Sequence, residues 1–114
     1  MTRKDPALFL EDILEAMNKI EKYTEDKDIE EFRSNSMAVD AVLRNLEVIG
    51  EASTNIPSEF REKNPDIPWK RMIGLRNIVI HEYFGVDLNI IWRIVTKDLP
   101  ETKPLIEELL KDLE

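Results

Sequence analysis

Apolar side chains recur at helical spacing through most of this chain, and that periodicity restricts the fold more than any other feature of the sequence. Apolar and polar residues nowhere alternate with period two for long enough to predict a strand. Helices are expected at about residues 6–23, 29–52, 69–83, 88–99 and 101–113. We therefore predict an all-α fold, an antiparallel bundle of four or five helices, with residues 1–114 forming a single domain.

Local signals indicate where these helices begin and end. Asp5 is a good N-cap and Pro6 suits the first helical position, while Asp87 is placed to cap the fourth helix. Pro100 is expected to end that helix, because proline lacks the N–H group that a helix interior needs. Residues 53–68 hold three of the six prolines and are expected to be the longest irregular stretch.

The helix expected at 69–83 carries apolar side chains around more than half of its circumference. A helix with so wide an apolar arc is covered on more than one side. We expect the bundle to cover one side and a second subunit, in a homodimer, to cover the other. The remaining polar strip contains Lys70, Gly74, Asn77 and His81 at steps of four, three and four residues. The Asn77 amide is able to hydrogen-bond the imidazole or a bound phosphate.

The formal net charge of −8 limits how this chain could bind a nucleic acid. An acidic surface does not attract a phosphate backbone, so such a role requires a local basic site. We expect that the side chains of four cationic residues gather at one cleft: Lys70, Arg71, Arg76 and Arg44.

Cysteine and histidine usage restricts the chemistry. The chain has no cysteine and one histidine, His81. Thiolate nucleophiles and cysteine-based zinc sites are excluded, and a histidine-rich metal site is disfavoured. We expect neither a metal nor a cofactor. No apolar run approaches the roughly 20 residues that span a bilayer, and no signal-peptide stretch follows the charged residues 1–6. We therefore expect a cytoplasmic protein that does not bind a membrane.

Arg76 and His81 are the candidate catalytic residues. In a straight helix, positions five residues apart are separated by about 140° around the axis and about 7.5 Å along it. The pair converges only if the helix deforms near His81 or if a partner subunit supplies one member, and a two-fold interface favours the second arrangement. A neutral imidazole accepts a proton near neutral pH, and a guanidinium stabilises a pentavalent phosphorus transition state. The pair suits metal-independent RNA cleavage, in which the 2′-hydroxyl attacks the neighbouring phosphorus.

Two segments of the chain resemble the HepT-like toxins of the HEPN superfamily. Residues 75–84 (LRNIVIHEYF) match the family motif of Arg, four residues, His, any residue and Tyr, which falls here on Arg76, His81 and Tyr83. Residues 44–52 (RNLEVIGEA) are similar to the second-helix block of the same family. Further matching residues are Pro68-Trp69, Gly85-Val86-Asp87 and Trp92.

The resemblance implies a dimer of helical bundles in which the two motifs face each other across a cleft. It implies ribonuclease activity, on tRNA or mRNA, and the role of toxin in a toxin–antitoxin pair. In that family the antitoxin is a minimal nucleotidyltransferase of the MntA type, which transfers AMP to the motif tyrosine, here Tyr83. An adenylate at this position would add bulk and negative charge beside Arg76 and block an RNA phosphate.

Two questions stay open at the level of the sequence. Glu47 and Glu51 either orient Arg76 or His81, or form salt bridges with Arg44. A non-catalytic module that binds a nucleotide or a partner protein is the alternative to an enzyme, because arginine and asparagine also bind phosphate without chemistry. A third hypothesis, a purely structural adaptor, predicts that loss of His81 changes no phenotype.

Overall fold

The computed structural model describes residues 5–81, 85 and 87–113, except for the side chains of Ile80 and His81. Over these residues the chain forms helices and no strand, which confirms the predicted all-α class. The helices are α1 (Pro6–Thr24), α2 (Ile29–Arg33), α3 (Ser36–Asn55), α4 (Ser58–Lys63), α5 (Trp69–His81), α6 (Leu88–Arg93), the π-helical segment η2 (Ile94–Asp98) and α7 (Leu99–Leu113). No helix in the described ranges is both long and apolar enough to cross a membrane.

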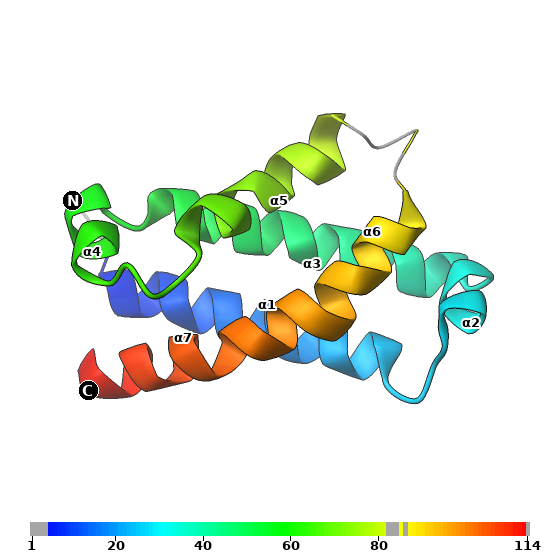
Figure 1. Cartoon of the computed structure of the whole chain (residues 1–114), viewed down its shortest axis with the longest axis horizontal. Helices are drawn as coiled ribbons and strands as arrows, with labels where there is room; N and C mark the ends of the chain where they lie inside the picture. The colour runs from blue at the N-terminus through cyan, green and yellow to red at the C-terminus, as the bar shows by residue number, and fades with distance from the viewer. Residues whose placement is uncertain (1–4, 82–84, 86, 114) are drawn as a thin grey trace.

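The bundle is built from α1, α3, α5 and α7, and successive members of this series run in opposite directions (Figure 1). α1 packs against α3 and α7, and α3 packs in turn against α5. The core consists of apolar side chains that these helices direct inward, including Leu10, Ile13, Met17, Val42, Leu46, Ile49, Leu75 and Ile106. The antiparallel bundle is thus confirmed for the protomer, whereas the homodimer stays a prediction.

Two predicted helix caps are present. The Asp5 side chain accepts a hydrogen bond from the backbone N–H of Ala7 at 2.9 Å, and Pro6 is the first residue of α1. The Asp87 side chain accepts one from the backbone N–H of Asn89, also at 2.9 Å, at the start of α6. Both carboxylates satisfy donors that a helix N-terminus leaves without an intrahelical partner.

The single helix expected at 29–52 is wrong, because the chain forms two helices there. The Asn35 side chain accepts a hydrogen bond from the backbone N–H of Ala38 at 3.0 Å and begins α3, after α2 has ended at Arg33. Asparagine competes in this way with the backbone pattern of a continuous helix. The stretch 53–68 is also more regular than predicted, since α3 continues to Asn55 and α4 follows.

Pro100 does not end its helix, contrary to the prediction. α6, η2 and α7 follow one another as one continuous helical rod (Figure 1). The backbone N–H of Leu99 bonds to the carbonyl of Ile94, five residues earlier, so the turn before the proline is wider than an α-helical turn. Pro100 then occupies the first turn of α7, where its missing N–H and fixed φ are tolerated.

Phe32 anchors the short helix α2, and its truncation tests the packing of this end of the bundle. Its side chain is fully buried, and its ring lies 5.2 Å from that of Trp92 between centroids. We expect Phe32→Ala to lower the free energy of unfolding by about 3–5 kcal/mol, as for other buried aromatic residues. Urea denaturation measures this change. Met37→Ala is the control, because Met37 is 82% exposed; equal losses in the two variants would contradict the described packing.

Candidate active site

Helix α5 carries the candidate motif and is α-helical throughout Trp69–His81. This confirms the predicted helix over the described residues. Tyr83 and the side chain of His81 lie outside the described part of the chain. Since the backbone does not depart from an α-helix between positions 76 and 81, these positions stay about 140° apart around the axis. The helix is therefore not deformed between the two motif positions, and the remaining way for Arg76 and His81 to converge is that a partner subunit supplies one of them.

Arg76 forms an ion pair with Glu51, which projects from α3. The Arg76 Nε and Glu51 Oε1 atoms are 2.9 Å apart, and the two side chains are 47% and 57% exposed. The contact uses the inner nitrogen of the guanidinium, and in the described part of the chain no other ion pair or hydrogen bond reaches this group. The side chain is about half exposed, and the parallel N–H donors of a guanidinium suit a phosphate.

Gly50 brings α3 and α5 together beside this ion pair. A Cβ atom added at Gly50 would lie 2.6 Å from the backbone nitrogen of Arg76 and 2.7 Å from its Cβ. Only a glycine therefore allows the two helices to approach this closely. Sequence reasoning attached no role to Gly50, although a glycine inside a helix costs about 1 kcal/mol relative to alanine. That cost was the available signal.

A second ion pair lies further along α3. Arg44 Nη1 and Glu47 Oε1 are 3.5 Å apart. The two glutamates therefore have different partners. Glu47 forms a salt bridge with Arg44 inside α3, and Glu51 pairs with Arg76 on α5.

A groove of about 350 Å³ connects the two ion pairs and is bordered by α1, α3 and α5. Its lining residues are Phe9, Asp12, Arg44, Glu47, Val48, Glu51, Ala52, Asn55 and Arg76. Three carboxylates therefore accompany two guanidiniums. Among the described residues, no group of His, Asp and Glu side chains is arranged to hold a metal ion.

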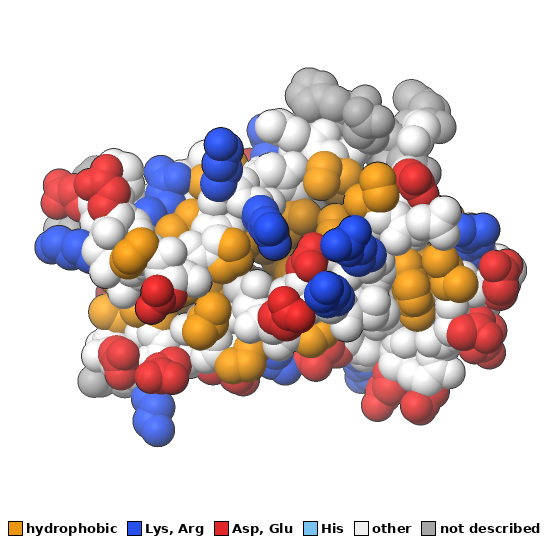
Figure 2. Space-filling model, viewed as in Figure 1, with side chains coloured by type: hydrophobic (Ala, Val, Ile, Leu, Met, Phe, Trp, Pro, Cys, Tyr) orange, Lys and Arg blue, Asp and Glu red, His pale blue; other side chains and the backbone are white. Residues whose placement is uncertain are grey.

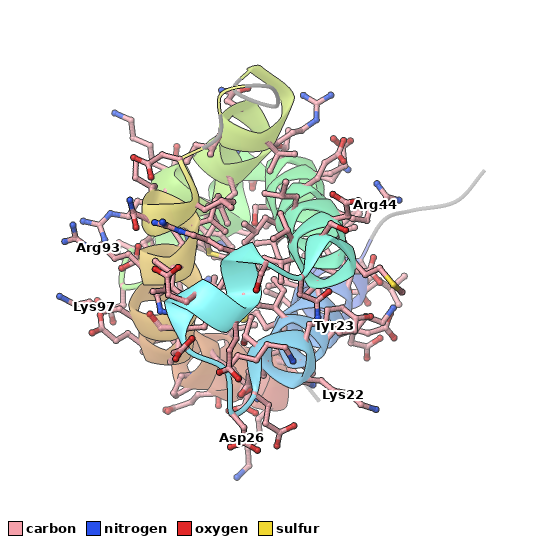
Figure 3. All side chains as sticks on the ribbon, turned by 90° about the vertical axis from the view of Figure 1, so that its right-hand side faces the viewer. Lys22, Tyr23, Asp26, Arg44, Arg93 and Lys97 are labelled. Carbon is pink, nitrogen blue, oxygen red and sulfur yellow. The ribbon has the colours of Figure 1, made fainter. Side chains whose placement is uncertain are left out.

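The groove lies on the side of the molecule away from α6. Figure 3 shows Arg44 pointing outward from α3, whereas Arg93 and Lys97 point outward on the opposite side. Figure 2 views that opposite side, where Lys and Arg side chains are interspersed with Asp and Glu. No large surface of one charge is visible on that face.

The predicted gathering of four cations at one basic cleft is wrong, because two of them lie elsewhere and the other two share their groove with three carboxylates. Arg44 and Arg76 line the same groove. Arg71 lines a different hollow, with Asp98 and Glu101 of the η2–α7 rod, and Lys70 lines a third. Helical geometry explains the separation, because positions 70 and 71 are about 120° and 140° from position 76 around the α5 axis.

Part of the polar strip on α5 is open in the protomer. The Asn77 side chain is exposed, and a Cβ atom added at Gly74 would meet nothing within 4 Å. Ile73 and Ile78 on the same helix are partly exposed. A surface of this kind has room for another chain or a ligand.

Comparison with known proteins places this site in a family. Residues 13–109 match the family model described as "Ribonuclease HepT-like". The chain belongs to the HepT-like ribonuclease family. The match includes the α3 block, the whole of α5 and the η2 segment, so both ion pairs lie within it.

Several curated HepT-like relatives are similar along nearly the whole chain. "Putative RNase MJ1380" of Methanocaldococcus jannaschii is 50% identical over 107 residues, which cover 94% of this chain and 98% of that protein. "Probable ribonuclease HepT" of Thermococcus cleftensis is 45% identical over 103 residues, which cover 90% and 94%. "Gamma-glutamylcyclotransferase and putative RNase MJ0434" of Methanocaldococcus jannaschii is 48% identical over 112 residues, which cover 98% of this chain and 49% of that protein. No solved structure matches significantly.

Substitution of Gly50 tests the close approach of α3 and α5. We expect Gly50→Ala to lower the free energy of unfolding by about 1–3 kcal/mol, because the new methyl group overlaps the Arg76 backbone. Gly74→Ala is the matched control inside α5, where the added methyl group has space; it should raise stability by about 1 kcal/mol. Chemical denaturation in dilute protein solution measures the free energy of unfolding of both variants. Equal effects at the two glycines would show that the helices do not meet at Gly50.

Proposed function

We propose that this HepT-like chain is an endoribonuclease that cleaves RNA without a metal ion and acts as the toxin of a toxin–antitoxin pair. The observation that carries the proposal is that Arg76, in a chain of a ribonuclease family, is both paired with a glutamate and partly exposed. Its side chain pairs with Glu51 through Nε and is 47% exposed, and it lies in the segment that matches the ribonuclease family. A fixed, half-exposed guanidinium is suited to bind a scissile phosphate.

The proposed reaction uses Arg76 with two copies of His81. One imidazole accepts the proton of the 2′-hydroxyl, whose oxygen attacks the adjacent phosphorus. The bond from phosphorus to the 5′-oxygen then breaks, and a second, protonated imidazole donates a proton to that leaving oxygen. The products are a 2′,3′-cyclic phosphate and a 5′-hydroxyl. Arg76 stabilises the additional negative charge of the pentavalent transition state, and Glu51 keeps the guanidinium oriented.

The reaction requires two subunits, because one α5 helix separates the motif positions. The regular backbone of α5 supports a composite site in which Arg76 of one subunit acts with His81 of the other. The open surface around Gly74 and Asn77 supports α5 as the contact between subunits. Asn77 would then lie at the cleft as a hydrogen-bond donor to the imidazole or the phosphate.

Mixing two inactive variants tests the composite site. Purified protein should cleave RNA in the presence of EDTA, and Arg76→Ala or His81→Ala should each abolish cleavage. When the two variants are mixed and allowed to exchange subunits, half of the dimers contain one intact Arg76–His81 pair. These dimers keep a single His81, whereas the proposed reaction uses one imidazole as base and a second as acid, so we expect the mixture to stay inactive. A return to about one quarter of the wild-type activity would show that one Arg76–His81 pair is sufficient and would refute the step that uses the second imidazole. Full activity of either folded single variant would refute the assigned roles.

We further propose that an antitoxin with nucleotidyltransferase activity inactivates the chain at Tyr83. The tyrosine oxygen would attack the α-phosphate of ATP, forming a phosphodiester bond to AMP and releasing pyrophosphate. Tyr83 is two residues beyond His81 in the sequence, so the added phosphate would compete with an RNA phosphate for Arg76. This mechanism needs no change in the fold.

Mass spectrometry tests this regulation. We expect the chain, when it is co-expressed with a nucleotidyltransferase encoded beside its gene, to gain mass in units of AMP and to lose ribonuclease activity. Tyr83→Phe should prevent the mass increase and remain active, while Tyr23→Phe serves as the control for modification elsewhere. An AMP adduct that persists in Tyr83→Phe would assign the modification to another residue.

A further inference from the structure

We propose that the groove between α1, α3 and α5 is a binding subsite for the RNA strand next to the cleaved bond, with Arg44 binding a second phosphate. This inference rests on the proposed function, because it takes single-stranded RNA as the ligand. It adds a substrate-binding residue on a different helix from the catalytic motif. The ligand class follows from two guanidiniums that line one groove.

The two arginines that line the groove come from different helices, Arg44 from α3 and Arg76 from α5. Arg44 and Glu51 are seven residues apart on α3, so they differ by only about 20° around the helix axis and by about 10.5 Å along it. Glu51 pairs with Arg76, and Glu47, one turn earlier on the same face of α3, pairs with Arg44. A strand whose scissile phosphate binds Arg76 and which follows α3 would therefore bring a later phosphate to Arg44.

Arg44 is free enough to bind a ligand. Its side chain is 70% exposed, and its ion pair with Glu47 is 3.5 Å long. An exposed pair of this kind contributes at most about 1 kcal/mol, so it does not prevent a phosphate from binding. A guanidinium also carries five N–H donors, more than one carboxylate can accept. Figure 3 shows the side chain directed outward, away from the body of the bundle.

The rest of the groove fits a nucleotide between the two phosphates. Val48 lies on α3 between the positions of Arg44 and Glu51, is partly exposed and supplies apolar surface for a ribose or a base. Asp12 and Glu47 supply acceptors for the amino group of a base. These carboxylates also repel phosphate, so binding depends on the two arginines and not on a general positive charge.

A salt-dependence experiment tests Arg44 without interference from cleavage. The ligand is a single-stranded oligonucleotide with 2′-O-methyl groups throughout, which has no 2′-hydroxyl nucleophile, and its dissociation constant is measured by fluorescence anisotropy over a range of salt concentrations. We expect Arg44→Gln to weaken binding and to reduce the slope of log Kd against log salt by about 0.7, the value for one lost phosphate contact on a single strand. Arg44→Lys, which retains the charge, should keep the wild-type slope.

Arg93→Gln is the matched control, because it removes the same charge from an exposed position on the opposite side of the molecule (Figure 3). The subsite is overturned if Arg44→Gln and Arg93→Gln have equal slopes, if Arg44→Lys behaves as Arg44→Gln, or if the wild-type chain does not bind the oligonucleotide. Cleavage of unmodified RNA is measured in parallel. If binding depends on Arg44 but no RNA is cleaved, the subsite is supported and the ribonuclease function is refuted. If RNA is cleaved but neither binding nor cleavage depends on Arg44, the ribonuclease function is supported and the subsite is refuted.

Discussion

The contact between Gly50 and the backbone of Arg76 is the constraint on which the candidate site depends. With a side chain at position 50, α3 and α5 could not approach as closely as they do. Glu51 follows Gly50 on α3 and reaches the Arg76 Nε across the same crossing. The helix packing and the orientation of the guanidinium thus have one cause, and a residue with no side chain determines the position of one with a long, flexible side chain.

This arrangement also explains how an acidic chain can present cations to a nucleic acid. With a net charge of −8, the protein has no general attraction for phosphate. Arg44 and Arg76 are instead each held by one glutamate, at two positions of one groove. Ion pairs of this kind add little to stability. They restrict the directions in which a guanidinium points, and in the proposed reaction this would orient Arg76 toward the scissile phosphate and Arg44 toward the strand.

The sequence predicted the helical class and the antiparallel bundle because apolar periodicity and caps such as Asp5 are local signals. The prediction of helix boundaries failed where a capping residue or a proline competes with the apolar periodicity around it. Asn35 divides a stretch whose apolar pattern is continuous, because its side chain caps a new helix. Pro100 permits a helix that it was expected to end, because a wider turn precedes it. Neither outcome can be read from the periodicity of the residues alone.

The sequence by itself determined which residues are candidates for chemistry, since a motif of Arg76, His81 and Tyr83 depends only on residue type and spacing. It also determined the family, because similarity extends along nearly the whole chain. Only the tertiary structure decided which glutamate meets which arginine, and that Arg71 is separated from Arg76 while Arg44 joins it. The physical reason is that these relations link residues on different helices, whose crossing is determined by packing at Gly50 and not by any local preference.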